Sequence, residues 1–230
     1  QAGPSCRAFT PVSILGKMFR YLAEQTKTPI CCHLDHGFSY MECKEGIENG
    51  FTSVMYDGSK KPLKENIKTS YKISQLAHKH NISVEGEIGE VGYFKGQNSK
   101  GTDVNEAKEY SLKSKVDAMA ISVGNTHLQT SKIAKINYQK ILDIQKITRL
   151  PLVLHGSSGI SYTMRNKIAR STKVAKFNIG TELRMIACES LRKSYNNNIK
   201  NFDKISIIKP SIKALKKETI KVIKNIGPKK

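Results

Sequence analysis

The distribution of apolar residues along the chain constrains its fold more than any other feature. Six short runs rich in apolar and β-branched residues occur at residues 29–34, 52–56, 82–87, 118–123, 151–154 and 174–179. Segments with a helical spacing of apolar residues separate them, at residues 12–24, 63–80, 105–114, 138–148 and 162–171. Strands that alternate with helices indicate βαβ units and a parallel sheet. The runs lack a regular polar alternation, as expected for strands that are buried on both faces.

The C-terminal part follows a different pattern. Residues 181–195 are predicted to form a helix, and a polar, Asn-rich connector follows at residues 196–201. A final helix is predicted over residues 210–226, with Pro210 at its start and Gly227 at its end. No internal repeat or second domain is indicated, so residues 1–230 are predicted to form a single α/β domain.

The charge of the chain raises the question of nucleic-acid binding. The formal net charge is +20, from 39 Lys and Arg against 19 Asp and Glu. The lysines are spread along the whole sequence and are not interleaved with aromatic residues, and no nucleic-acid-binding motif is present. We therefore interpret them as a solvated surface. A milder functional interpretation is that the positive charge attracts anionic sugar phosphates, and nucleic-acid binding is the weaker alternative.

The cysteines and the apolar runs bear on the location of the protein. The five cysteines have no spacing typical of a disulfide framework or a zinc knuckle. Reduced thiols in the cytoplasm are the simplest interpretation. No run of 18 apolar residues is present, so no membrane-spanning helix is predicted, and the amino end does not resemble a signal peptide.

Polar residues gather where the predicted strands end. They are His33, Asp35 and His36; Asp57 and Ser59; Glu85 and Glu87; Asn125, Thr126 and His127; His155, Ser157 and Ser158; and Asn178 and Thr181. In a (β/α) barrel the catalytic groups come from the carboxyl ends of several strands, which lie on one face. A lone histidine is most often structural, but three at strand ends predict a joint functional site.

Three of these histidines suit a metal ion. His36, His127 and His155 follow three different strands. Imidazole is a preferred ligand of Zn²⁺, and a catalytic zinc commonly takes three protein ligands and leaves one position open. Because these residues are far apart in the sequence, they predict a catalytic zinc site and not a compact zinc finger.

The last two strand ends are suited to a phosphate. Gly156 lets a ligand approach the backbone closely, and the turn at residues 157–159 precedes a predicted helix. Residues 178–181 also lead into a helix. Helix amino ends offer free N–H groups to phosphate, and barrels of this kind frequently bind phosphate after their last two strands.

Six sequence motifs resemble those of a known family. They are HLDHG at 33–37, SVMYDGS at 53–59, VEGEIG at 84–89, NTH ending at 127, PLVLHGSSGI at 151–160 and FNIGTELR at 177–184. In this combination and order, the chain resembles the class II fructose-bisphosphate aldolases, including their tagatose-bisphosphate relatives, over nearly its whole length.

The resemblance implies an α/β fold of the (β/α)8 TIM-barrel type. Such a barrel has eight strands, whereas six are predicted here. We therefore expect that the first two strands of the barrel are lacking at the amino terminus and that the domain is N-terminally incomplete. The absence of an initiator methionine agrees with this expectation.

The resemblance also implies roles for individual residues. Asp35 matches the catalytic acid/base, and His36, His127 and His155 match the zinc ligands. Arg184 matches an arginine that reaches the distal phosphate in a neighbouring subunit, although a surface arginine is the alternative. The other matches to substrate-binding positions are Gly156, Ser157, Ser158, Asn178, Ile179, Gly180 and Thr181.

The implied activity is a zinc-dependent lyase reaction of glycolysis and gluconeogenesis. It is the reversible aldol cleavage of fructose 1,6-bisphosphate into dihydroxyacetone phosphate and glyceraldehyde 3-phosphate. Zn²⁺ stabilises the negative charge as a Lewis acid, and Asp35 acts as general acid/base on the other triose. The resemblance further implies a monovalent cation (Na⁺ or K⁺) and a homo-oligomer, a dimer or a tetramer.

Two departures from the family pattern leave alternatives open. Leu128 stands where the family has a glycine that contacts the substrate phosphate. In the loop at residues 92–103, Lys95 and Gln97 stand where acids are expected. Either proton abstraction is impaired, or another group such as Glu90 or Asp103 performs it. The alternative to an active aldolase is a non-catalytic barrel of the same descent that binds zinc or sugar phosphate.

The choice between fructose and tagatose bisphosphate also stays open. The residue at position 180 separates the two groups in the family, but Gly180 matches neither of them. Arg184 and the C-terminal helix are closer to the fructose-specific group, and they favour fructose 1,6-bisphosphate as the substrate.

Overall fold

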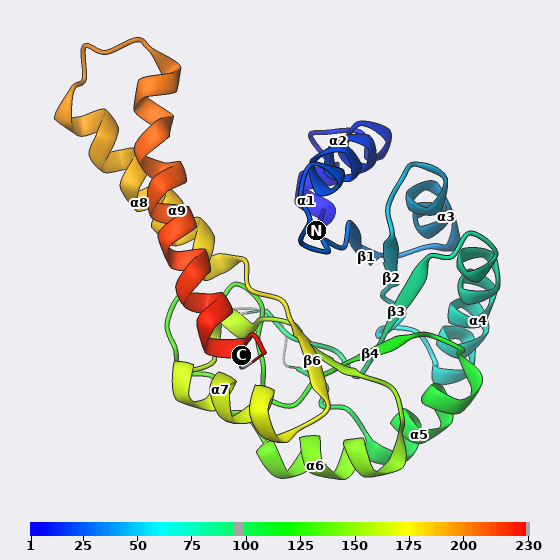
Figure 1. The fold of residues 1–230 in the computed structure, drawn as a ribbon. Helices are drawn as coiled ribbons and strands as arrows, with labels where there is room; N and C mark the ends of the chain where they lie inside the picture. The colour runs from blue at the N-terminus through cyan, green and yellow to red at the C-terminus, as the bar shows by residue number, and fades with distance from the viewer. Residues whose placement is uncertain (94–98, 229–230) are drawn as a thin grey trace.

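The computed structural model describes residues 1–93 and 99–228, and its centre is a curled sheet (Figure 1). All six strands run parallel and pair in chain order. They are β1 (His33–Gly37), β2 (Ser53–Tyr56), β3 (Ser83–Ile88), β4 (Ala118–Ile121), β5 (Leu152–Leu154) and β6 (Val174–Phe177). The predicted parallel sheet of βαβ units is confirmed, and the observed architecture is a half-barrel.

Helices cover the convex side of this sheet, as Figure 1 shows. One helix connects each pair of consecutive strands, because parallel neighbours cannot be joined by a tight turn. These helices are α3 (Tyr40–Glu48), α4 (Leu63–Lys79), α5 (Val104–Lys113), α6 (Tyr138–Ile147) and α7 (Tyr162–Ser171). Before β1 lie α1 (Pro4–Arg7) and α2 (Val12–Glu24), and the short 3₁₀ helix η1 (Ser157–Gly159) follows β5.

The strands are apolar on both sides because both sides are covered. Val54, Met119 and Leu152 belong to the large cluster between the sheet and its helices. The next residues along three strands, Met55, Ala120 and Val153, form a separate small cluster. Successive strand residues point to opposite faces, so the second cluster lies on the concave side of the sheet and forms the floor beneath the strand ends.

Some predicted boundaries were wrong. The first strand begins at His33 and not at residue 29. Helix α3 was not predicted, although Ser39 accepts a hydrogen bond from the N–H of Glu42, a capping arrangement readable from the sequence. The last helix begins at residue 204 because Asp203 caps it by accepting N–H groups, so Pro210 lies inside the helix and not at its start.

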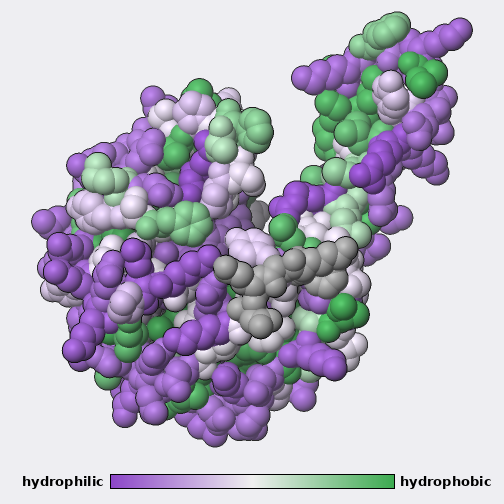
Figure 2. Space-filling view, turned by 180° about the vertical axis from the view of Figure 1, so that it is seen from behind, coloured by the Kyte–Doolittle hydropathy of each residue, from purple (hydrophilic) through white to green (hydrophobic). Residues whose placement is uncertain are grey.

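The chain ends in a helical hairpin that projects from the sheet (Figure 1). It consists of α8 (Thr181–Asn197) and α9 (Lys204–Ile226), which pack along each other. The end of α9 is held against α7, where the side chain of Asn166 donates to the carbonyl of Asn225 at 2.7 Å. No residue of α8 is fully buried, and Figure 2 shows apolar residues on the surface of the projecting part.

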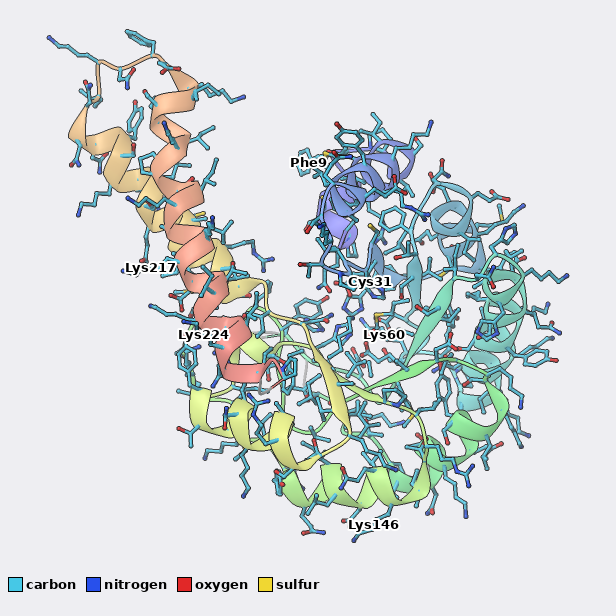
Figure 3. The ribbon with its side chains drawn as sticks, viewed as in Figure 1. Phe9, Cys31, Lys60, Lys146, Lys217 and Lys224 are labelled. Atoms are coloured by element: carbon cyan, nitrogen blue, oxygen red, sulfur yellow. The ribbon has the colours of Figure 1, made fainter. Side chains whose placement is uncertain are left out.

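The lysines lie on outer surfaces that are far apart. Lys146 lies on α6 beneath the sheet, whereas Lys217 and Lys224 lie on the hairpin (Figure 3). This distribution agrees with a dispersed basic surface and gives no support to one nucleic-acid-binding face. Among the described residues, none of the helices has the length and apolarity needed to cross a bilayer.

Candidate metal centre and substrate pocket

A cavity of about 350 Å³ opens where the strands end. Its walls come from the end of β1 and from segments that follow β3, β4, β5 and β6. It brings together most of the residues predicted to form the site: Asp35, His36, His127, His155, Gly156, Ser158, Asn178, Gly180, Thr181 and Arg184. The segment before β1 adds Gln1, Gly3, Pro4 and Ser5, which sequence reasoning missed. Catalytic groups of barrels occupy this position.

The three predicted zinc ligands converge in this cavity. One ring nitrogen from each of His36, His127 and His155 lies within 4.8 Å of the others. The Nδ1 of His36 is 2.8 Å from a carboxylate oxygen of Asp57, and the Nε2 of His155 is 2.8 Å from one of Glu85. We assign the protons to these two nitrogens, because a carboxylate only accepts hydrogen bonds.

This assignment leaves two ring lone pairs facing each other. The Nε2 of His36 and the Nδ1 of His155 are 3.0 Å apart. In the neutral forms of both rings, two lone pairs at this distance repel unless a proton or a metal ion lies between them, and the side-chain amide nitrogen of Asn178 is also 3.1 Å from His155 Nδ1. Ligand nitrogens of a tetrahedral zinc, each at about 2.0–2.1 Å from the ion, are about 3.3 Å apart. The donor set therefore fits a divalent metal, and Asp57 and Glu85 supply the carboxylates that typically orient histidine ligands.

The surroundings shift the pKa values of His127 and His36 in opposite directions. Burial and the positive charges of His155 and His36 lower the pKa of His127 to about 3, which keeps it in the neutral form that binds metals. Burial also disfavours the charged form of His36, but the hydrogen bond to Asp57 and the nearby carboxylates outweigh burial and raise its pKa to about 9. This negative surrounding favours a cation.

His36 is also close to two carboxylates, Asp57 and Glu87. Asp57 and Glu87 each offer an oxygen within 4.8 Å of a ring nitrogen of His36. Burial would raise the pKa of Asp57, yet its hydrogen bond to His36 holds that pKa at about 2. Burial, together with the charge of Asp57, raises the pKa of Glu87. The sequence placed both residues at strand ends but assigned them no role.

A lysine that sequence reasoning missed supports the site from β6. The Nζ of Lys176 lies 2.7 Å from Glu85 Oε2 and 3.4 Å from His33 Nε2. Burial alone would raise the pKa of Glu85, but Lys176 and His155 lower it and keep the carboxylate charged. Burial and Lys176 lower the pKa of His33 to about 4, and its Nδ1 lies 2.8 Å from Ser53 Oγ. We interpret His33 as a neutral structural residue.

Asp35 is placed as a charged acceptor inside the cavity. Its carboxylate accepts the side-chain N–H of Asn178 at 3.2 Å and that of Gln1 at 3.4 Å. Burial raises the pKa of Asp35, but the positive charges of His155 and His36 outweigh burial and lower it. The group is therefore a carboxylate at neutral pH, ready to accept a proton.

Four residues that line the cavity have backbone N–H groups that are available to a ligand. Those of Leu128, Gly156, Gly180 and Thr181 donate no hydrogen bond within residues 1–93 and 99–228. Gly156 has φ 61°, and a Cβ there would come within 2.3 Å of a carbonyl oxygen. Thr181 begins α8, whose amino end is partially positive. We call these four residues the N–H cradle; it suits a phosphate.

Arg184 adds a charge to the cradle. Its Nη2 donates to Thr181 Oγ1 at 3.2 Å, and the side chain lines the cavity of its own chain. Two other predicted substrate-binding residues do not line this cavity. Ser157 is buried and donates its hydroxyl to the carbonyl of Leu154 at 2.8 Å, and Ile179 lines an adjoining cavity of about 620 Å³.

Leu128 and Tyr93 both lie beside His127. Leu128 lines the cavity in a left-handed conformation, with φ 56° and 54% of its surface exposed. The ring of Tyr93 stacks on that of His127, with centroids 5.0 Å apart. Lys95 and Gln97 lie outside the described residues. Of the alternative acids, Glu90 lies 3.5 Å from Lys60.

The second alternative acid has a structural role. The carboxylate of Asp103 caps α5 by accepting the N–H groups of Asn105 and Glu106. Neither Glu90 nor Asp103 lines the cavity at the strand ends. Asp35 is therefore the carboxylate that lines the cavity, as far as the described residues show.

Known proteins share both sequence and fold with this chain. The sequence model of the family described as "Fructose-bisphosphate aldolase class-II" matches residues 1–230. The fructose-bisphosphate aldolase of Staphylococcus aureus (strain Mu50) is 37% identical over 207 residues, which cover 86% of this chain and 71% of that protein. The 6-phospho-5-dehydro-2-deoxy-D-gluconate aldolase of Shouchella clausii is 33% identical over 223 residues, or 95% of this chain and 74% of that protein.

Two solved structures have a similar fold. The YdjI aldolase of Escherichia coli K12 superposes with a TM-score of 0.80 at 28% identity, covering 98% of this chain and 79% of its own. The fructose-bisphosphate aldolase of Campylobacter jejuni has a TM-score of 0.78 at 19% identity, covering 94% and 75%. The second comparison shows the shared fold alone.

Proposed function

The chain belongs to the class II fructose-bisphosphate aldolase family, and we propose that it catalyses the reversible, zinc-dependent cleavage of fructose 1,6-bisphosphate into dihydroxyacetone phosphate and glyceraldehyde 3-phosphate. Members of the family are metal-dependent lyases. The observation that carries the proposal is the convergence of one ring nitrogen from each of His36, His127 and His155 within 4.8 Å of one another, in the cavity that Asp35 also lines.

The proposed metal ligands are His36, His127 and His155, and three imidazoles favour zinc over magnesium or calcium. Bound zinc supplies a Lewis acid for the negative charge that develops on substrate oxygens. Asp57 and Glu85 keep the ring nitrogens of His36 and His155 in the binding tautomer. These two carboxylates also offset the positive charge of the ion.

Asp35 is proposed as the general acid/base. In the cleavage direction its carboxylate accepts the proton of the hydroxyl group whose oxygen becomes the aldehyde oxygen of glyceraldehyde 3-phosphate. In the synthetic direction the same group returns that proton. The lowered pKa keeps Asp35 ionised at neutral pH, so the residue starts the cleavage in the form that can accept a proton.

The N–H cradle is proposed to hold the phosphate of dihydroxyacetone phosphate. The four cradle residues, Ser158 and Arg184 all line the same cavity. Gly156, Asn178, Gly180 and Thr181 line that space, whereas Ser157 and Ile179 contribute by placing the backbone. A sodium or potassium ion close to this segment is a further expectation from the resemblance.

A panel of three substrates tests the proposed specificity. We expect kcat/KM for fructose 1,6-bisphosphate to exceed that for tagatose 1,6-bisphosphate at least tenfold. The third substrate is 6-phospho-5-dehydro-2-deoxy-D-gluconate, because the Shouchella clausii relative is an aldolase of that name. Preference for either competitor would overturn the proposed substrate. Zinc binding without turnover of any of the three would favour the non-catalytic alternative.

Replacing Leu128 with glycine is expected to lower KM about fivefold, equivalent to about 1 kcal/mol. The leucine side chain lines the cavity next to the N–H cradle, and its removal gives the phosphate more room. The free energy of unfolding should change by less than about 1 kcal/mol, because relief of the left-handed strain offsets the entropic cost of glycine. Initial rates and urea denaturation measure the two quantities. An unchanged KM would show that this side chain does not restrict the substrate.

We also propose that the chain forms a homo-oligomer, a dimer or a tetramer, through the hairpin of α8 and α9. Phe202 is 94% exposed and Ile205 is 71% exposed near the tip of this hairpin. Contiguous exposed apolar surface commonly marks a protein interface. Charged residues on the same helices keep the free chain in solution until the apolar side chains are covered.

Replacing both Phe202 and Ile205 with aspartate is expected to convert the oligomer to a monomer. A carboxylate buried without a partner at an interface is strongly unfavourable. Analytical ultracentrifugation gives the mass of the particle. The matched control is Leu112→Asp, an exposed apolar position on α5 that should leave the mass unchanged. A variant that sediments like the parent chain would exclude the hairpin tip as the interface.

The finer description of the fold and location is also proposed. We propose that the six-stranded curl corresponds to strands of a (β/α)8 barrel and that the chain forms one domain. The TM-score of 0.80 with the YdjI aldolase supports this correspondence. A glycolytic aldolase works where its phosphorylated substrate is found, so we propose a cytoplasmic location.

A further inference from the structure

Arg7, at the end of α1, contacts the backbone that carries two site residues. Its Nη1 donates to the carbonyl of Asp35 at 2.5 Å, and its Nη2 donates to the carbonyl of His36 at 3.0 Å. Nη1 also reaches the carbonyl of Ala2 at 2.8 Å. The side chain is only 9% exposed, so the guanidinium is a built part of the protein interior.

These two carbonyls lie where the sheet ladder is irregular. The pairing of β1 with β2 shifts register between Leu34 and Gly37, so Asp35 and His36 have no regular partners in β2. His36 also has φ 52°, a left-handed conformation that costs energy for a residue other than glycine. Such a conformation persists only where surrounding contacts hold it.

The guanidinium supplies those contacts. Its planar fork offers several N–H donors in a fixed geometry, which suits two neighbouring carbonyl oxygens. On the other side, Arg7 lies 3.2 Å from the carboxylate of Glu42, whose helix α3 begins just after β1. Arg7 therefore joins the segment before β1, the end of β1 and the start of α3.

We propose that Arg7 is a positioning residue for the metal centre and the acid/base. By holding the carbonyls of Asp35 and His36, it fixes the directions in which the carboxylate and the imidazole project into the cavity. Arg7 also holds the segment around α1 through its hydrogen bond to the carbonyl of Ala2. Gly3, Pro4 and Ser5 of this segment form part of the cavity wall. The inference rests on the proposed metal site.

The test compares Arg7→Met and Arg7→Lys with the parent chain after removal of bound metal. Met keeps most of the length of the side chain but has no donor, whereas Lys keeps the charge but loses the fork. Cobalt(II) is titrated into the parent protein and each variant, and its visible absorption reports the coordination geometry. The matched control is Arg20→Met, an exposed arginine on α2 paired with Glu24 at 2.7 Å. Far-UV circular dichroism checks that each variant is folded.

We expect Arg7→Met to bind cobalt about 10- to 100-fold more weakly than the parent, the loss typical of outer-shell changes at metal sites. Its absorption band should change in shape, and added guanidinium ion should partly restore the parent spectrum. At saturating zinc, kcat should fall about tenfold while KM changes less than about threefold, because the N–H cradle belongs to other strands. The cobalt affinity and kcat of Arg7→Lys should lie between those of Arg7→Met and those of the parent. Arg20→Met should have the same cobalt affinity and kcat as the parent.

Parent-like cobalt affinity and spectrum in both Arg7 variants would overturn the inference and leave the proposed metal site intact. Should Arg7→Met not fold, Arg7→Lys decides alone, and a parent-like cobalt site in that variant overturns the inference. A parent chain that binds no cobalt would overturn both the proposed site and the role of Arg7.

Discussion

Replacing His127 with alanine is expected to lower kcat for aldol cleavage by at least about 1,000-fold. The substitution removes one of three nitrogens that converge within 4.8 Å, and a site with two protein ligands holds zinc poorly. Loss of the Lewis acid removes several kcal/mol of stabilisation from the developing charge. Zinc content by mass spectrometry and initial rates on fructose 1,6-bisphosphate measure the two effects.

The matched control is His80→Ala. His80 is exposed at the end of α4 and should be replaceable without loss of zinc or rate. The fold of His127→Ala is checked by circular dichroism, since this residue also stacks on Tyr93. A folded variant that keeps one zinc ion per chain and the parent rate would show that His127 is not a ligand of the working metal.

Replacing Asp35 with asparagine is expected to lower kcat by about 100- to 10,000-fold, the range of general acid/base catalysis. The amide has the same shape as the carboxylate but cannot accept a proton at neutral pH. Zinc content should stay at the parent value, because Asp35 is not one of the three converging ligands. The pair of variants thus separates metal binding from proton transfer.

Asp143→Asn is the control for this substitution. Asp143 lies on the surface of α6 and lies 3.1 Å from Lys146, far from any proposed chemistry. Its replacement should leave kcat unchanged. If Asp35→Asn kept more than about a tenth of the parent kcat, another group would perform the proton transfer, and Asp35 would have only a binding role.

The parallel sheet was predictable because strands that are buried on both faces consist of nearly continuous apolar runs. Strands such as β2 and β5 have every residue buried, and their composition is accordingly apolar. The starts of β1 and α9 were predicted less accurately. The strand predicted from residue 29 begins only at His33. The helix predicted to start at Pro210 begins at residue 204, because Asp203 provides the cap.

The convergence of the three histidines was predictable for a related reason. Parallel strands place their carboxyl ends on one face, so histidines that follow separate strands are brought together whatever their distance in sequence. Arg7 could not be identified in this way. Its partners are backbone carbonyls of Asp35 and His36, and any residue type presents such a carbonyl.

Two other residues that contact the site could not be predicted from the sequence. Lys176 lies within an apolar strand, and the sequence does not show that its side chain turns toward Glu85. Tyr93 stacks on His127 from a segment whose family pattern differs here. The first contact joins β6 to β3, and the second joins the segments that follow β3 and β4. Local sequence patterns encode neither of these pairings.

The central claim is that one divalent ion, held by His36, His127 and His155, is required for the reaction. The most direct test removes all metal with a chelator, assays cleavage of fructose 1,6-bisphosphate, and then titrates zinc back. We predict that activity disappears and returns fully when one zinc ion per chain is bound. Cleavage at the parent rate by the metal-free protein would contradict the claim.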